Sequence, residues 1–198
     1  MKKGVFIIAV VFASCSFVGA QSKFSLGPTA GVGFSSLSNV ENSKSKLSGS
    51  AGLSMVYSAV EHFGIGVDVK YSFEGTTVEF NGLKSSLDLD YVRIPIKATY
   101  FFNKYGNKLR PKIFAGPSLG FLTKAKEDGV QNKTDYNSFD LGLLLGIGLN
   151  YRLVNKTWFN ADFTSTSGLS DVTKNTTFNN DKNANRNFQL NVGVNFGL

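Results

Sequence analysis

Seven charged residues stand at alternate positions inside stretches that otherwise combine apolar residues with glycine and serine. Carboxylates and cationic groups confined in a narrow space can form ion pairs, or can pass a proton or an ion between them. The spacing therefore predicts either an internal network of ion pairs or a path for ions, and we favour the network. The seven residues are Asp68, Lys70, Arg93, Lys97, Lys112, Asp140 and Asp162.

Other reactive groups are sparse. His62 is the only histidine, and it has no cysteine or carboxylate at metal-ligand spacing around it. A membrane-embedded hydrolase or acyltransferase would need a nucleophile with a base, or an acid paired with histidine. The predicted loops hold only scattered acidic residues, such as Glu41, Asp128, Asp171 and Asp181. We therefore predict no catalytic residue, no metal and no cofactor, and a protein that is not an enzyme.

Three Gly-x-Gly segments resemble parts of phosphate-binding loops: Gly31–Gly33, Gly64–Gly66 and Gly146–Gly148. None is followed by a helical pattern, which a nucleotide-binding loop requires. The net charge is +7, but the basic residues are dispersed rather than gathered in a patch or stripe. We predict neither nucleotide nor nucleic-acid binding. We interpret the glycines as positions without a side chain that leave room for neighbouring side chains inside a narrow fold.

The stretch Asn187 to Leu198 shows what kind of element carries such residues. Its apolar residues alternate without error with amides and glycines. A period of two predicts a β-strand with one apolar face. A polar face of amides and glycines, rather than lysines and glutamates, is typical of a strand between lipid and a narrow lumen.

The same alternation recurs in seven earlier segments, so the pattern predicts eight strands. Long polar connections alternate with short ones along the chain, which is the rhythm of a transmembrane barrel with both termini in the periplasm. We therefore predict an all-β, eight-stranded antiparallel up-and-down transmembrane β-barrel, whose lumen is only wide enough for its own side chains. The other predicted strands are 24–35, 47–59, 63–74, 87–102, 109–122, 139–151 and 158–164, and the long loops are 36–46, 75–86, 123–137 and 168–186.

Aromatic residues on the predicted outer face gather near the strand ends, as expected for girdles at the two membrane interfaces. The girdle assigned to the periplasmic side is Phe24, Tyr57, Phe63, Tyr100, Phe102, Tyr151 and Phe159. The girdle assigned to the opposite, outer side is Phe34, Phe73, Phe121 and Phe139.

The two ends of the chain predict export and assembly. Lys2 and Lys3 precede a short apolar run, and Val18 to Ala20 supplies small residues, so residues 1–20 read as a signal peptide cleaved after Ala20. The barrel domain then covers residues 21–198. Lipidation of Cys15 is the less favoured alternative. Phe196 and Leu198 are predicted to form the C-terminal signal that the barrel-assembly machinery recognises during insertion.

Three segments resemble a known family: Tyr91 to Lys97 (Tyr-Val-Arg-Ile-Pro-Ile-Lys), Ile113 to Gly120 (Ile-Phe-Ala-Gly-Pro-Ser-Leu-Gly) and Phe139 to Gly146. They are similar to the outer-membrane protein β-barrel domain family, often labelled PorT-like and common in Gram-negative bacteria. The resemblance covers nearly all of the chain after Gln21. It implies an eight-stranded barrel in the outer membrane, and most members of the family have no assigned activity.

From these observations we expect an integral outer-membrane barrel, a monomer in outer-membrane lipid with a side-chain-filled, porin-like but plugged lumen. Its role would be structural or interactive through the outer loops, whose ligand the sequence does not name. One alternative is a narrow transport or secretion-accessory barrel of the PorT-like kind. A second is a soluble lipocalin-like binding barrel, which would place its apolar face inside.

Overall fold

Alternating apolar and polar residues produce long strands throughout the chain. The computed structural model describes residues 23–40, 42–80, 82–104, 106–174 and 182–198. The signal-peptide prediction and Cys15 lie outside the described residues. No helix within these ranges is long and apolar enough to cross a membrane. The elements are β1 (Phe24–Leu37), β2 (Ser43–Tyr57), β3 (Phe63–Phe80), β4 (Leu83–Phe101), β5 (Leu109–Glu127), β6 (Val130–Gln131), the 3-10 helix η1 (Lys133–Asp135), β7 (Phe139–Val154), β8 (Thr157–Gly168) and β9 (Asn185–Gly197).

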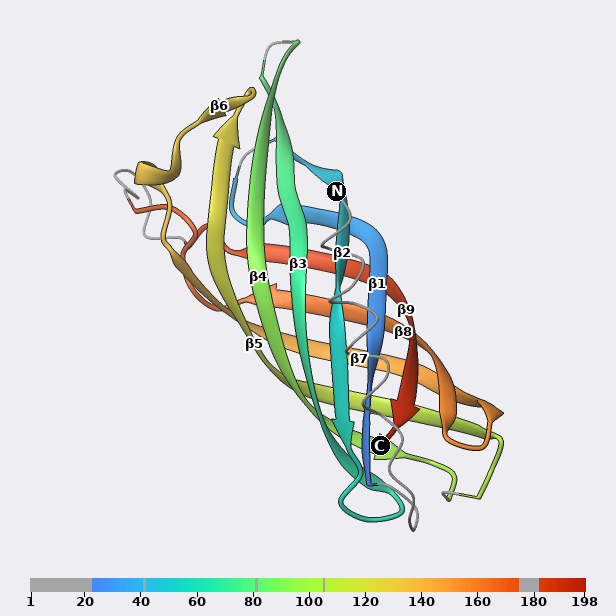
Figure 1. Cartoon of the computed structure of the whole chain (residues 1–198). Helices are drawn as coiled ribbons and strands as arrows, with labels where there is room; N and C mark the ends of the chain where they lie inside the picture. The colour runs from blue at the N-terminus through green and yellow to red at the C-terminus, as the bar shows by residue number, and fades with distance from the viewer. Residues whose placement is uncertain (1–22, 41, 81, 105, 175–181) are drawn as a thin grey trace, which may run out of the picture.

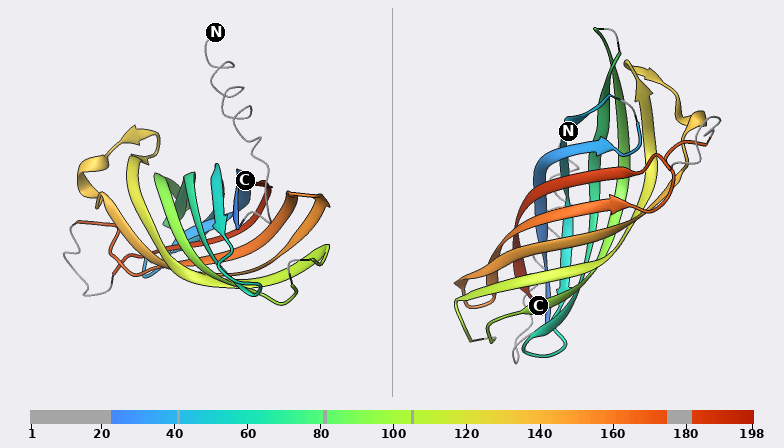
Figure 2. Two further views of the ribbon diagram at one scale, coloured as in Figure 1. Left: turned by 60° about the horizontal axis from the view of Figure 1, so that its bottom comes forward. Right: turned by 180° about the vertical axis from the view of Figure 1, so that it is seen from behind.

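The eight long strands close into one antiparallel barrel, as predicted. Each pairs with its neighbour along the chain, apart from the two-residue β6, which forms a hairpin on the end of β5. The ring closes where β1 pairs with β9, for example Phe34 with Phe188 and Leu26 with Phe196. Closure leaves no long sheet edge, since every long strand has two partners. The tilted strands wrap around a common axis (Figures 1 and 2).

Several segments predicted as loops are strand instead. β3 continues to Phe80 and β4 begins at Leu83, so the predicted loop 75–86 is mostly a hairpin that projects from one end of the barrel (Figure 1). β5 continues to Glu127, and β1 and β2 enter the predicted loop 36–46. The continuation of β3 agrees with the spacing of Val78 and Phe80, which indicates that strand continues into this connection. The loop predictions were wrong where β1, β2 and β5 extend, because the apolar–polar alternation weakens there while the backbone pairing continues, for example Leu87 with Glu127.

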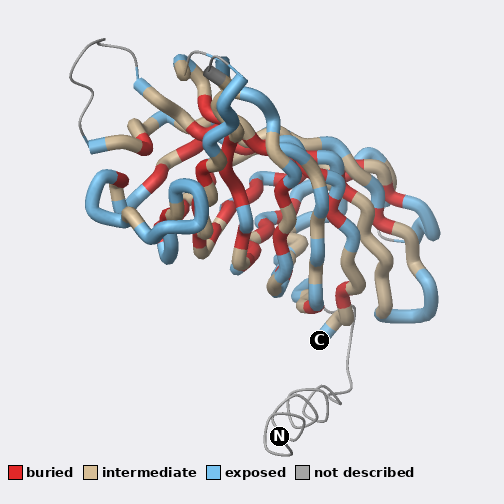
Figure 3. Tube along the Cα trace, turned by 90° about the horizontal axis from the view of Figure 1, so that it is seen from above, coloured by how far each residue is buried: buried red, intermediate tan, exposed pale blue. Residues whose placement is uncertain are grey.

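The two faces of the barrel differ as the alternation predicts. Outward apolar side chains are exposed on every side, as with Leu53 on β2, Ile147 on β7 and Leu190 on β9. Most buried inward side chains are polar or charged, with apolar exceptions such as Phe114 and Leu144. Buried or half-buried positions alternate with exposed ones along much of the wall (Figure 3). An apolar exterior and polar interior is the arrangement of a transmembrane barrel, and it is the reverse of a lipocalin-like barrel.

Aromatic rings lie in contact near both ends of the outer surface. At the end that carries the start of β1 and the end of β9, hereafter the terminal end, Phe24 and Tyr57 lie with ring centroids 5.2 Å apart. Tyr100 packs there against Phe63 at 5.1 Å and Phe102 at 5.3 Å, and Tyr151 pairs in register with Phe159. Towards the opposite end, hereafter the outer end, the Phe121 and Phe139 centroids are 5.6 Å apart.

Candidate functional site: the closed lumen

All seven predicted charges point into the lumen and are buried. They come from β3, β4, β5, β7 and β8, because inward positions recur at every second residue of each strand. Buried charges are stable only when they are paired and hydrogen-bonded. The lumen meets this requirement in two separate groups of ion pairs.

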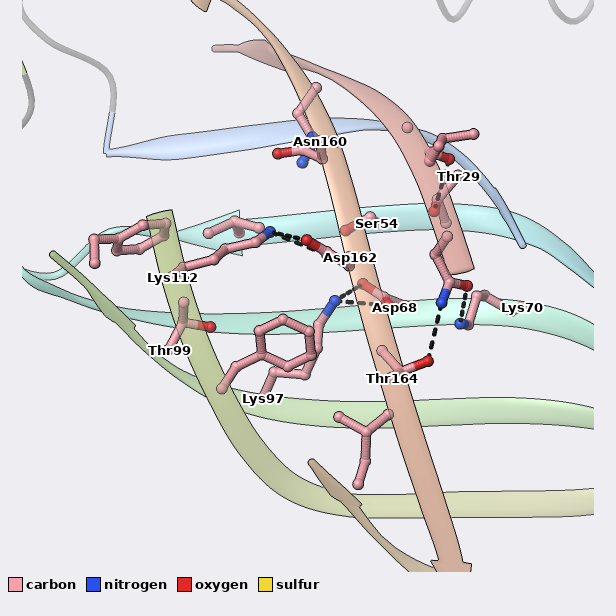
Figure 4. Close-up of a pocket in the computed structure, with 18 residues that line it drawn as sticks. Thr29, Ser54, Asp68, Lys70, Lys97, Thr99, Lys112, Asn160, Asp162 and Thr164 are labelled. Atoms are coloured by element: carbon pink, nitrogen blue, oxygen red, sulfur yellow. Dashed lines mark hydrogen bonds and ion pairs between the residues drawn. The ribbon is translucent and has the colours of Figure 1, made fainter. Parts of the chain in front are cut away.

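The group nearer the terminal end contains two lysine–aspartate pairs (Figure 4). Lys97 Nζ donates to both carboxylate oxygens of Asp68, at 2.8 and 2.7 Å. Lys112 Nζ lies 2.8 Å from Oδ1 of Asp162 and donates to Oδ2 at 3.0 Å. The Lys112–Asp162 pair joins β5 to β8 across the lumen, since β7 lies between these strands in the sheet.

Lys70 is held by an amide rather than by a carboxylate within ion-pair distance. Its Nζ donates to Oδ1 of Asn191 at 3.1 Å, and Asn191 donates in turn to Oγ1 of Thr164 at 3.0 Å (Figure 4). Lys70 therefore ties β3 to β9, and Asn191 ties β9 to β8. The amides on the inward face of β9 complete the network that the charges begin.

The group nearer the outer end is centred on Arg93. Its guanidinium donates to both carboxylate oxygens of Glu74, each at 2.6 Å, and to Oδ2 of Asp140 at 2.7 Å. Ser170 donates to Asp140 Oδ1 at 2.8 Å and Asn185 donates to Oδ2 at 3.0 Å. The arrangement spans the barrel and satisfies most of the polar atoms it buries.

Two buried charged residues were missing from the predicted network. Glu74 is 2% exposed and supplies a bidentate partner to Arg93. Glu74 lies an even number of residues after Asp68 and Lys70 on β3, so its inward direction could have been inferred from the sequence. Arg110 lies at the terminal end of β5 and donates to the backbone oxygens of Asn103 and Glu61, at 3.1 and 2.7 Å. It lies two residues before Lys112 on β5 and therefore points to the same side of the sheet.

Glycines on the inward face make room for the ion pairs. A Cβ added at Gly148 would lie 2.1 Å from Oδ1 of Asp162, and one at Gly120 would lie 2.8 Å from Nη1 of Arg93. Only about 20 Å³ remains empty around the Lys97 and Lys112 pairs, which is room for about one water molecule. The middle of the lumen is therefore filled.

An apolar cluster closes the outer end of the lumen. Val172, from the connection between β8 and β9, is 1% exposed, and Tyr136, from the connection between β5 and β7, is 5% exposed. The two connections are joined by backbone hydrogen bonds, including Asn137 N–H to the Val172 oxygen at 2.8 Å. The cluster consists of Leu37, Leu87, Leu89, Tyr91, Leu122, Ala125, Tyr136 and Val172.

His62 lies at the terminal end, away from both charge groups. Its Nδ1 is 2.7 Å from the backbone oxygen of Phe101, and its ring stacks on Tyr100 with centroids 5.8 Å apart. Among the described residues, no three histidine, cysteine or acidic side chains are grouped to hold a metal ion.

Comparison with known proteins identifies the family of this barrel. Residues 19–174 match the family described as outer membrane protein beta-barrel domain. The chain belongs to this family. The match covers more than half of the chain, so this barrel is an outer-membrane protein in a lipid environment. No curated protein sequence matches it significantly.

Solved structures of other outer-membrane barrels share the fold. Neisserial surface protein A superposes with a TM-score of 0.62 and 18% sequence identity, covering 91% of this chain and 100% of that chain. The outer membrane protein OprG from Pseudomonas aeruginosa gives a TM-score of 0.58 and 14% identity, covering 90% and 97% respectively. At these identities the similarity establishes the fold alone.

Proposed function

We propose that this outer-membrane barrel does not conduct solutes and acts through its outer extensions. These are residues 43–46 of β2, 75–80 of β3, 83–88 of β4 and 123–131 of β5 and β6, at the outer end. The observation that carries the proposal is the closed lumen, filled by ion pairs in the middle and by an apolar cluster at the outer end. A barrel whose interior is occupied by its own side chains offers partners only its outside and its ends.

The outer extensions support an interaction role because they are ordered by specific contacts. Lys44 pairs with Glu79, and Lys46 pairs with Asp88. The backbone N–H of Ser86 donates to Asp128 at 2.7 Å, which ties β4 to the β5–β6 turn. A surface held in one conformation loses less conformational entropy when it binds a partner.

Exposed apolar residues on these extensions are consistent with a protein partner. Leu83, at the tip of the β3–β4 hairpin, is 78% exposed, and Val130 on β6 is 70% exposed. Large apolar side chains on an exposed tip gain free energy when a partner removes them from water.

The proposal is tested by shortening the β3–β4 hairpin. Replacing residues 78–85 with Asn-Gly would join Thr77 to Ser86, which already face each other in the ladder, through a turn suited to hairpins. We expect the variant to reach the outer membrane at the wild-type level but to leave the envelope defects of a gene deletion uncorrected. The Lys84→Gln variant should correct them. Full correction by the shortened barrel would contradict the proposal.

A non-enzymatic role is part of the same proposal. His62 is engaged by Phe101 and Tyr100, and the buried carboxylates near Arg93 and the two lysines are held in ion pairs. Carboxylates held in this way are poorly placed to exchange protons with a substrate. Hydrolysis of an ester or a peptide by the purified barrel, lost on replacing His62, would contradict it.

We also propose that residues 1–20 direct export, with cleavage after Ala20, and that Phe196 and Leu198 are read by the barrel-assembly machinery. Phe196 pairs with Leu26 and Thr157, and the N–H of Leu198 donates to the Phe24 oxygen at 3.0 Å. Both residues thus lie where the barrel closes.

Truncation and substitution separate recognition from packing. Deleting residues 194–198 should abolish insertion in cells. The Phe196→Ala/Leu198→Ala double variant should fail to insert in cells yet refold in detergent, because the backbone pairing of β9 is retained. Loss of both insertion and refolding in the double variant, or normal insertion of the truncated chain, would contradict a recognition role.

A further inference from the structure

The terminal end of the lumen is hollow, unlike the filled middle. A cavity of about 300 Å³ opens there, between the ends of β1, β2, β4, β5, β7, β8 and β9. This volume is at the lower end of the range for small-molecule sites. We call this cavity the vestibule. Its lining includes Asn195 and Gly197 of β9, and Figure 1 shows the end of this strand beside the C-terminus. The vestibule therefore lies at the end predicted to face the periplasm.

The vestibule wall carries one sign of charge. Four basic residues line it, whereas no acidic side chain of the described part of the chain does so. Cations around a cavity with low-dielectric walls concentrate their field in its interior and attract anions. The four residues are Lys23, Arg110, Arg152 and Lys156.

The backbone of the two lysines and the side chain of Arg152 are anchored at the rim of the cavity. The Lys23 and Lys156 backbone oxygens each accept a hydrogen bond at 2.7 Å, from Ser58 and Gly197 respectively. Neither lysine forms an ion pair within the residues described. The Arg152 guanidinium lies 5.9 Å from the Trp158 ring centroid and donates to the Gly106 oxygen at 3.0 Å. These lysine ammonium groups therefore remain available to an incoming anion.

Two buried amides give a second, independent indication of a ligand. Asn195 is 3% exposed and Asn150 is 9% exposed, and both line the vestibule. The Oδ1 atom of each is buried without a hydrogen-bond partner. An unsatisfied buried polar atom costs about 1–3 kcal/mol, so a bound group that donates hydrogen bonds would recover this loss. A side-chain amide can accept from a hydroxyl, or donate after a half-turn.

We propose that the vestibule binds a small hydroxylated anion, a sugar bearing a carboxylate or phosphate group, that enters from the terminal end. Lys156, Lys23 and Arg152 would hold the anionic group, while Asn150 and Asn195 would bind the hydroxyls. The vestibule opens inside the barrel wall rather than onto the lipid face, which favours a soluble ligand over a lipid headgroup. This site is separate from the outer extensions and does not depend on their proposed role.

Trp158 makes the proposal directly measurable. It is the only tryptophan in the chain and it lines the vestibule, so its fluorescence reports on binding there. The experiment uses the full barrel refolded in an amine-oxide detergent, which carries neither sugar nor phosphate. Gluconate and glucose 6-phosphate are the probes, glucose is the neutral control, and acetate is the anionic control without hydroxyls.

We expect saturable changes in Trp158 emission with both anionic sugars, none with glucose, and at least about tenfold weaker binding of acetate. Lys156→Gln and Arg152→Gln should each weaken gluconate binding by about tenfold, since each removes a charge-assisted contact. Asn195→Ala should weaken gluconate more than acetate. Lys84→Gln, at the outer end, is the matched control and should bind like the wild type.

Three results would overturn the proposal: no response to either anionic sugar, equal responses to glucose and gluconate, or unchanged binding in both charge variants. Refolding of each variant is checked by its heat-modifiable migration on a gel, and Lys156→Gln keeps the test decisive because this exposed side chain is not needed for closure. A response that appears only in vesicles containing phosphatidylglycerol would assign the site to a lipid headgroup and equally overturn it.

Discussion

Arg93 on β4 and Asp140 on β7 meet inside the lumen at 2.7 Å, although β5 separates their strands in the sheet. The contact is reinforced by the bidentate pairing of Arg93 with Glu74 on β3. Because the guanidinium links three strands from within, it limits how far the barrel wall can expand. Bidentate arginine–carboxylate pairs are also the most strongly directional of ion pairs.

Removing the Arg93 charge should destabilise the barrel strongly. Arg93→Met would leave Glu74 and Asp140 buried without their cation, which costs about 3–5 kcal/mol. Urea unfolding in lipid vesicles, followed by Trp158 fluorescence, measures the loss. The triple variant Arg93→Met/Glu74→Gln/Asp140→Asn should recover most of it, because no unpaired charge remains. An Arg93→Met barrel as stable as the wild type would show that this network does not hold the wall.

The exposed apolar face should tolerate no charge at mid-barrel. Ile147 on β7 is 61% exposed and points outward, so in a membrane its side chain faces lipid. Ile147→Arg should reduce the free energy of unfolding in vesicles by about 2–4 kcal/mol. Leu83→Arg, at the tip of the β3–β4 hairpin, is the control and should change it little. Equal effects at the two positions would contradict the assignment of this face to lipid.

The β4–β5 contact at the outer end should depend on pH. The carboxylate of Asp128 accepts hydrogen bonds from Ser86 N–H at 2.7 Å and Ser85 Oγ at 3.0 Å. These bonds hold the pKa of Asp128 below its usual value. A lowered folded-state pKa means that the stabilisation is complete above the unfolded-state pKa and is lost as the pH falls through the folded value.

Amide hydrogen exchange at Ser86 measures this dependence. Protection of the Ser86 N–H should persist from neutral pH down to the ordinary titration range of aspartate and then decline. Asp128→Ala should expose this amide at every pH. Protection that is the same in Asp128→Ala and in the wild type would show that the carboxylate does not order this turn.

The alternation of residue types predicted most of the fold because each face of a membrane strand has a single environment. It placed Arg93 and Lys112 inside and Ile147 outside, and it located the closing pair of strands. It failed where β5 continues beyond Leu122 to Glu127, because the charged residues there interrupt the alternation. Sequence spacing also could not reveal which charges pair, since partners such as Lys112 and Asp162 meet only after the ring closes.

The apolar cluster at the outer end was likewise invisible in the sequence. Val172 and Tyr136 come from connections that the sequence marks as polar and charged. They are buried because the two connections pair over the end of the barrel. The vestibule was missed for a related reason: Lys23 and Arg110 are far from Arg152 and Lys156 in the chain, and the four residues come together only when the ring closes.

Conductance of the purified barrel in a planar bilayer tests the central claim, a lumen closed by its own side chains. The wild-type barrel should give no steady current at any applied voltage. A variant that removes both groups of ion pairs and the outer cluster should show unitary steps and serves as the positive control. In it Asp68, Glu74, Arg93, Lys97, Lys112, Asp140 and Asp162 are changed to alanine, and Tyr136 and Val172 to glycine. Reproducible unitary conductance from the wild-type barrel would contradict the account and favour a transport role.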